Sequence, residues 1–237
     1  MSNAAHIKVS PAMRWLARLR ARFWAIANES KPKSWFHQLF FRNRLLLRCI
    51  GIRVPSLHSA QAYGGAYGDL TTLLLAWKVA SYVRDDKLRV AHEIGIGSYG
   101  ILSIYVAKKF PALKLSGSTI EPAEIETAQR VISDNQLEIP LILSDVLEEV
   151  EGVFDIIWWN LPYYEKQVLE YLERLFRQVR DKPMLSQKGR IVLGFNSVPL
   201  KTEEVVNLVG RFPHLRIAEN RFYWWNPHRV LSIERCD

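Results

Sequence analysis

The sequence has few cysteines and no long hydrophobic run. Only Cys49 and Cys236 are present among the 237 residues, and their separation matches neither a metal-binding spacing nor a disulfide framework. The longest apolar stretches, such as Leu73–Trp77, are far shorter than the roughly 18 residues of a membrane-spanning helix. The first thirty residues contain scattered arginines and no unbroken apolar core, so we expect no secretory signal and a cytoplasmic protein.

The composition is that of a globular protein, but the charge is unevenly placed. Hydrophobic residues make up 49% and charged residues 24% of the chain, which excludes disordered and collagen-like classes. Residues 1–68 contain eleven basic side chains and one acidic side chain, a net charge of +10, whereas the remaining residues carry −2. We therefore expect a basic N-terminal extension over residues 1–68, followed by a domain over residues 69–237.

Two helices are expected in this basic extension. Apolar residues recur on one helical face between residues 12 and 28, and a second helix begins near Ser34 and ends at Gly51. Arginines alternate with tryptophan and phenylalanine, a mixture that suits RNA phosphates and bases, and we favour this partner. A cap over the substrate site, a peripheral contact with an anionic membrane and a merely solvated helix face are the alternatives.

From Leu88 onward short β-rich runs alternate with helical stretches. Strands are expected near residues 88–94, 114–120, 140–144, 153–159, 189–196, 214–222 and 228–234. Helices are expected from Asp69 to about Val83 and near residues 99–109, 122–136, 165–180 and 201–211. This alternation predicts an α/β fold with a Rossmann-like, seven-stranded mixed sheet and helices on both faces. The last two strands have no helix between them and should pair antiparallel at one edge.

The first motif is the glycine-rich turn that follows the first expected strand. Glu93 lies near the end of this strand, and Gly95 and Gly97 follow it before a helix begins. Glycines at these positions let the backbone turn sharply and let a ligand approach without a Cβ in the way. The pattern is typical of nucleotide-binding folds, the alternative being a tight turn that binds nothing.

Polar residues also follow the next three expected strands. Thr119 and Glu121 follow the second strand, Asp145 the third, and Asn160-Leu161-Pro162-Tyr163 the fourth. The ends of parallel strands meet at one edge of a sheet, so these residues should lie close together. An acidic side chain after the second strand can hold both hydroxyls of a ribose.

Taken together, these motifs resemble those of class I S-adenosylmethionine-dependent methyltransferases, over residues 69–237. The chain looks most like the subgroup with an Asn-x-Pro-Tyr motif, which includes rRNA N-methyltransferases and release-factor glutamine methyltransferases. The resemblance implies S-adenosylmethionine as cofactor, with Gly95 and Gly97 at its methionine part and Asp145 at the adenine amine. It also implies cofactor contacts for Thr72 and Glu93. The family's usual ribose-binding acid falls on Thr119, so Glu121 is the substitute, with Thr119 as a secondary contact.

The tetrapeptide also makes chemical sense on its own. A planar amine or amide nitrogen is a poor nucleophile, and a site that accepts hydrogen bonds from its N–H groups helps to free the lone pair. The side-chain oxygen of Asn160 and the carbonyl of Leu161 are suitable acceptors, because Pro162 holds the chain extended. Tyr163 offers a stacking face. The alternative is an Asn-x-Pro turn that merely caps a strand.

The predicted function is an S-adenosylmethionine-dependent N-methyltransferase, with Asn160, Pro162 and Tyr163 holding the acceptor. A nucleobase in RNA is the favoured acceptor, and a protein glutamine or a small molecule is the alternative. A non-catalytic module that docks onto nucleic acid or membrane is the competing hypothesis of another class. No metal site is expected, because the six histidines are scattered without ligand spacing. His92 and the pair Trp158-Trp159 are expected to be core residues.

Overall fold

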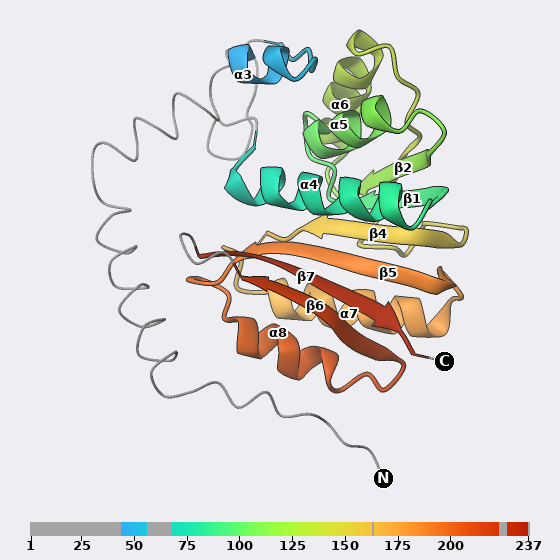
Figure 1. Ribbon diagram of the computed structural model, residues 1–237, viewed down its shortest axis with the longest axis vertical. Coiled ribbons are helices and arrows are strands. Elements are labelled where there is room, and N and C mark those ends of the chain that lie inside the picture. Colours follow the sequence, from blue (N-terminus) through green and yellow to red (C-terminus); the bar gives the residue numbers. More distant parts are fainter. Residues whose placement is uncertain (1–43, 56–67, 163, 223–226, 237) are drawn as a thin grey trace.

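The structure, a computed structural model, describes residues 44–55, 68–162, 164–222 and 227–236 (Figure 1). The helices are α3 Arg44–Cys49, α4 Leu70–Asp85, α5 Ile101–Lys109, α6 Pro122–Asp134, α7 Val168–Asp181 and α8 Thr202–Val209. The strands are β1 Val90–Ile94, β2 Lys114–Thr119, β3 Leu141–Leu143, β4 Phe154–Asn160, β5 Leu185–Asn196, β6 Leu215–Phe222 and β7 His228–Arg235. All seven expected strands and the five helices expected from Asp69 onward are present, with ends shifted by a few residues.

The strands form one seven-stranded sheet in the order β3-β2-β1-β4-β5-β7-β6. Strands β1 to β5 pair in parallel, whereas β7 pairs antiparallel with both β5 and β6. The predicted Rossmann-like mixed sheet is therefore confirmed. The reversed strand is β7, which lies one place in from the edge strand β6. The connection between β6 and β7 is too short for a crossover helix, so these two strands can only pair antiparallel.

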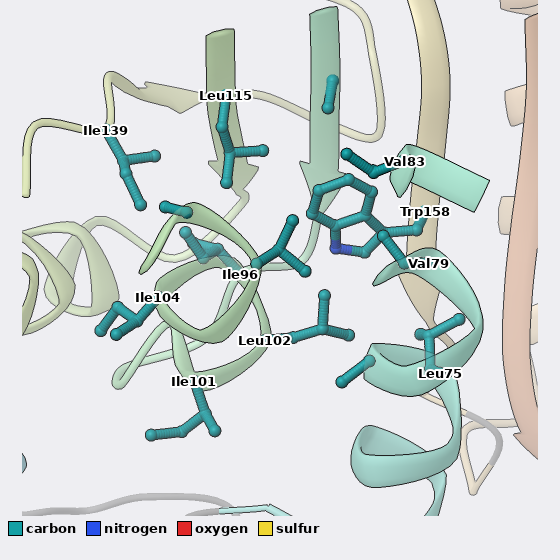
Figure 2. Close-up of a cluster of buried hydrophobic side chains, with 14 of the residues drawn as sticks. Leu75, Val79, Val83, Ile96, Ile101, Leu102, Ile104, Leu115, Ile139 and Trp158 are labelled. Carbon is teal, nitrogen blue, oxygen red and sulfur yellow. The ribbon is translucent and has the colours of Figure 1, made fainter. Parts of the chain in front are cut away.

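Helices cover both faces of the sheet. Figure 1 shows α4, α5 and α6 on one side and α7 and α8 on the other, and each side has its own apolar cluster. Neighbouring residues of a strand point to opposite faces, so Trp158 and Trp159 of β4 enter different clusters. Figure 2 shows the indole of Trp158 among side chains of α4 and α5, including Val79 and Leu102. The expectation that both tryptophans are core residues is confirmed.

The N-terminus of α4 is fixed at the carboxyl edge of the sheet. Asp69 caps this helix, because its side chain accepts a hydrogen bond from the backbone N–H of Thr72. The helix also lies very close to β5: a Cβ added to Gly194 would come within 2.8 Å of Cγ2 of Thr71. The glycine therefore lets α4 approach the sheet, and this approach brings Thr72 next to the end of β4.

His92 of β1 is a core residue, as expected. It is fully buried, and its two ring nitrogens form hydrogen bonds with the hydroxyls of Ser116 and Ser118 at 2.8 and 3.0 Å. Burial lowers the pKa of His92 to about 3, so the ring is neutral at physiological pH. Among the described residues no group of three or more histidine, cysteine, aspartate or glutamate side chains could hold a metal ion.

Only residues 44–55 and Gly68 of the basic extension lie within the described residues. Leu47, Ile52 and Val54 are buried and belong to the same apolar cluster as side chains of α4 and α5. Arg53 exchanges backbone hydrogen bonds with the side chain of Asn135, which follows the last turn of α6. Residues 1–43 and 56–67, with both predicted arm helices apart from α3, lie outside the described residues, so their role as a cap stays a prediction. No helix in the described ranges is long and apolar enough to span a membrane.

Candidate active site

A pocket opens at the carboxyl edge of the sheet, where the loops after β1, β2, β3 and β4 meet the N-termini of α4, α5 and α6. It has a volume of about 660 Å³. Nine of the ten residues predicted from the sequence line it: Thr72, Glu93, Gly95, Gly97, Thr119, Glu121, Asp145, Asn160 and Pro162. The tenth, Tyr163, lies outside the described residues. The structure thus brings together side chains that are up to 90 positions apart in the sequence.

The glycine-rich turn forms one wall of this pocket. Gly95, Gly97 and Gly100 all have positive φ angles of +64°, +64° and +56°. A Cβ on Gly95 would lie 2.9 Å from Nε1 of Trp159, whereas a Cβ on Gly97 would meet nothing within 4 Å. Gly100 is the N-cap of α5, which begins two residues later than expected because this left-handed residue cannot join the helix. The turn therefore leaves space for a ligand beside Gly97.

Glu93 lies at the base of the pocket and supports the helix that follows the turn. Its carboxylate accepts hydrogen bonds from the backbone N–H of Ser103, at 3.1 Å, and from the Ser103 hydroxyl. The N-cap of α5 is a glycine without a side chain, so Glu93 replaces the missing cap from the neighbouring strand. Complete burial raises the pKa of Glu93 to about 8, although the Ser103 hydrogen bonds oppose this shift.

The side chain of Asn160 is held in one orientation by Thr72. The Thr72 hydroxyl donates its single proton to Oδ1 of Asp69 at 2.9 Å. Its oxygen can therefore only accept from Asn160, whose Nδ2 lies 3.1 Å away. Oδ1 of Asn160 must consequently point away from Thr72. This oxygen is buried and meets no hydrogen-bond donor in the described part of the chain.

The backbone after Asn160 continues along β5 and then turns. The N–H of Leu161 donates to the carbonyl of Gly194 at 2.9 Å, and the N–H of Glu165 donates to the carbonyl of Pro162 at 2.9 Å. Pro162 is half-buried in the pocket wall, and the exposed Tyr164 lies at the same pocket. The tetrapeptide thus does act as a turn at the end of a strand, and it also presents Asn160 to the pocket.

The acids after β2 differ in their surroundings. Glu121 is exposed, whereas Glu124 in the first turn of α6 is half-buried and accepts a hydrogen bond from the Thr119 hydroxyl at 2.6 Å. Glu124 was not among the site residues predicted from the sequence. The only signal was an acid one turn into the helix that follows Thr119, a position where glutamate commonly favours the helix N-terminus. Ile120 next to them lies in the pocket with 60% of its surface exposed.

Acidic side chains dominate the pocket. Asp145 forms an ion pair with Arg174 of α7, which fixes its carboxylate beside the loop after β3. No lysine, arginine or histidine is among the described residues that line the pocket. Six acidic residues line it, of which Glu93 is largely protonated near neutral pH because its pKa is raised: Asp69, Glu93, Glu121, Glu124, Asp145 and Glu165. Such a site favours a ligand that carries positive charge.

The sequence of the chain also matches the model of a known protein family. The model described as the methyltransferase small domain matches residues 59–223 of the chain. The chain belongs to this family. The match includes the glycine-rich turn, every other strand end that lines the pocket and the Asn160 loop. The prediction of a methyltransferase domain is confirmed at the level of the family.

Two relatives of this methyltransferase domain carry different names. The ribosomal RNA small subunit methyltransferase C of Actinobacillus succinogenes is 28% identical over 125 residues, which are 53% of this chain and 34% of that protein. A putative protein N5-glutamine methyltransferase of Methanocaldococcus jannaschii is 31% identical over 138 residues, 52% of this chain and 69% of that protein. The chain thus spans about a third of the length of the first relative.

Solved methyltransferases share the fold. A methyltransferase from Pyrococcus furiosus superimposes with a TM-score of 0.62 and 21% identity, over 81% of this chain and 93% of that one. A 16S rRNA N2 methyltransferase from Thermus thermophilus, solved in complex with AdoMet and guanosine, has a TM-score of 0.55 and 19% identity. That likeness covers 76% of this chain and 45% of the other.

The two glycines of the turn should respond differently to substitution. Alanine costs roughly 1–2 kcal/mol at either position because of the positive φ angle. We expect Gly95→Ala to lower the free energy of unfolding further than Gly97→Ala, since only the first places a methyl group against Trp159. Denaturant unfolding of the two variants provides the comparison. Equal destabilisation would contradict the close contact between Gly95 and Trp159.

Stability should depend on the ionisation of Glu93. Because burial raises its pKa from 4.5 to about 8, the folded state binds the proton more tightly than the unfolded chain does. The resulting contribution to stability is present below pH 4.5 and is lost as the pH rises through about 8. The free energy of unfolding of Glu93→Gln should therefore fall less between pH 5 and pH 9 than that of the wild type. Denaturant unfolding curves of both proteins at several pH values measure this difference. Parallel pH profiles would show that Glu93 does not titrate in this range.

Proposed function

We propose that the chain is an S-adenosylmethionine-dependent N-methyltransferase that acts on a planar amine or amide nitrogen, with a nucleobase in RNA as the favoured acceptor. The observation that carries this proposal is the buried, unpartnered Oδ1 of Asn160 at the pocket. A buried acceptor without a donor is costly, and native proteins keep few of them. A bound N–H group would satisfy it.

The proposed role of Asn160 is to accept a hydrogen bond from the N–H of the acceptor. The lone pair of a planar nitrogen is conjugated, and it becomes available as the nitrogen changes geometry during the reaction. Positive charge develops on that nitrogen during the transfer. A preorganised acceptor of its N–H group therefore stabilises the transition state more strongly than the ground state. S-adenosylmethionine supplies an electrophilic methyl group. Thr72 and Asp69 keep the amide oxygen in place, so no reorganisation is needed when substrate binds.

The residues of the pocket suit this cofactor. The space beside Gly97, which a Cβ would fill, admits a ligand close to the backbone. The acidic residues of the pocket other than Glu93 suit the positive sulfonium and ammonium groups, and the exposed Ile120 offers an apolar surface to the adenine ring. We propose that Gly95 and Gly97 line the methionine part, that Asp145 meets the adenine amine, and that an acid after β2 meets the ribose. Glu93 supports the turn through α5.

Two acceptors share the chemistry that Asn160 demands. A nucleobase amine and a glutamine amide both carry N–H groups on a planar nitrogen. The names of the ribosomal RNA methyltransferases and the basic residues 1–68 support RNA. The glutamine methyltransferase of Methanocaldococcus jannaschii supports the second candidate, since the match covers most of that protein. A module that only docks would not need the network between Asp69, Thr72 and Asn160, which argues against the non-catalytic alternative.

Removal of the Asn160 amide should slow methyl transfer strongly and spare cofactor binding. We expect Asn160→Ala to lower the rate of methyl transfer by roughly 100- to 1,000-fold, the usual cost of losing one preorganised group. Transfer of labelled methyl groups to total RNA, to protein extract and to small-molecule pools measures the rate and identifies the acceptor. Binding of S-adenosylhomocysteine should stay within a few-fold of wild type.

Thr72 provides the matched control. Thr72→Ser keeps the hydroxyl and should keep most of the activity, whereas Thr72→Val loses the hydroxyl that orients Asn160 and should lower the rate. An Asn160→Ala variant with wild-type activity would contradict the proposed role of this side chain. Equal losses in both Thr72 variants would show that the hydroxyl does not orient it.

The basic extension should strengthen RNA binding. Deletion of residues 1–43 removes eight basic side chains and one acidic side chain, and it keeps Leu47, Ile52 and Val54, which belong to the core. We expect weaker RNA retention and a shallower dependence on salt, because fewer phosphate contacts release fewer counterions. Filter binding across a salt series measures both quantities. Unchanged RNA affinity and salt slope would show that the basic extension does not bind RNA. If the extension instead promotes retention only on anionic vesicles, a membrane contact is favoured.

A further inference from the structure

The end of β2 holds a threonine where a ribose-binding carboxylate would be expected. Thr119 is buried at this strand end and lines the pocket. Its hydroxyl cannot replace a carboxylate: its proton is donated to Oε2 of Glu124, and its oxygen already accepts from the backbone N–H of Glu121. At most one acceptor site is then left for two ribose hydroxyls. A nearby acidic side chain must therefore bind the ribose hydroxyls, and Glu121 and Glu124 are the two candidates.

Glu124 is fixed at the pocket by two neighbours. The Thr119 hydroxyl donates to its carboxylate at 2.6 Å, and the backbone N–H of Glu124 donates to the carbonyl of Glu121 at 3.0 Å in the first turn of α6. The N-terminal end of the helix also stabilises negative charge at this position. A carboxylate has about four acceptor sites, and Thr119 uses one of them, so enough remain for two hydroxyl groups.

Glu121 is placed less favourably for the same task. Its side chain is exposed, and it makes no capping hydrogen bond to α6 although it is the N-cap residue. Its backbone N–H donates to Oγ1 of Thr119 at 3.3 Å, which helps to hold the threonine. An exposed, unanchored carboxylate must lose conformational freedom and compete with water when it binds a hydroxyl.

We propose that Glu124, held by Thr119, is the residue that binds the ribose hydroxyls of the nucleoside ligand. This assignment rests on the proposed function, because it presumes that S-adenosylmethionine occupies the pocket. In this assignment the ribose-binding carboxylate lies in the first turn of α6 and not at the end of β2, and the Thr119 hydroxyl links the two positions. Thr119 is then a positioning residue, and Glu121 contributes its backbone.

Calorimetry with S-adenosylhomocysteine and its 2′-deoxy analogue tests the assignment on the full chain. Glu124→Gln should bind S-adenosylhomocysteine about 10- to 100-fold more weakly than wild type, the range expected when a charged hydrogen-bond partner is lost. The same variant should lose much less affinity for the 2′-deoxy analogue, since one of the two hydroxyls is already missing. Glu121→Gln is the matched control and should change both affinities less than about threefold.

Variants of Thr119 give a second readout. Thr119→Val should reduce the affinity for S-adenosylhomocysteine more than the affinity for the 2′-deoxy analogue. Thr119→Ser keeps the hydroxyl and should therefore keep the wild-type ratio of the two affinities. A purely structural role of Thr119 would change both affinities by the same factor, which would overturn its assignment as a positioning residue.

A wrong assignment of Glu124 and a wrong proposed function would give different results. If the wild type binds S-adenosylhomocysteine but Glu121→Gln, not Glu124→Gln, reduces the affinity selectively, the ribose residue is Glu121 and the assignment is wrong. Equal losses of Glu124→Gln for both ligands would also overturn it, because a general loss of charge or structure has no preference for the hydroxyl. If the wild type binds neither ligand, the proposed function itself is wrong.

Discussion

The single proton of the Thr72 hydroxyl determines the orientation of the Asn160 side chain. Since this proton is donated to Asp69, the threonine oxygen can act only as an acceptor toward Asn160. It therefore faces the amide N–H of Asn160, and the amide oxygen points away from Thr72. The arrangement requires α4 to lie against the end of β4, and Gly194 permits this approach because any side chain there would collide with Thr71. A helix cap, a close helix-to-sheet contact and an oriented amide are thus parts of one structure.

The same edge of the sheet holds groups that do not favour folding. Glu93 is buried without a basic partner among the described residues near it, and Oδ1 of Asn160 is buried without a donor. Three glycines there have positive φ angles. Two apolar clusters, one on each face of the sheet, offset these costs. Binding and catalytic sites commonly retain such unfavourable groups, because a ligand can satisfy what the protein leaves unpaired.

Most of the fold and much of the site could be predicted from the sequence. The alternation of strands and helices predicts the sheet, and polar residues at four strand ends predict the pocket, since the topology of a parallel sheet brings such ends together. Local patterns could not predict contacts across elements. Nothing in the sequence indicates that Glu93 caps α5, that Thr72 orients Asn160, or that the Thr119 hydroxyl holds Glu124, because each depends on packing between separate segments. The start of α5 was misplaced because Gly100 adopts a left-handed conformation that the sequence does not reveal.

The central claim is that the pocket at the carboxyl edge binds S-adenosylmethionine beside Asn160. Calorimetric titration of the full chain with S-adenosylmethionine and S-adenosylhomocysteine tests it most directly, with Gly97→Val as the variant whose side chain fills the space that the glycine leaves open. The account predicts saturable binding at one site for the wild type and its loss in the variant. Absence of binding up to millimolar ligand, or unchanged binding in a folded Gly97→Val protein, would contradict it.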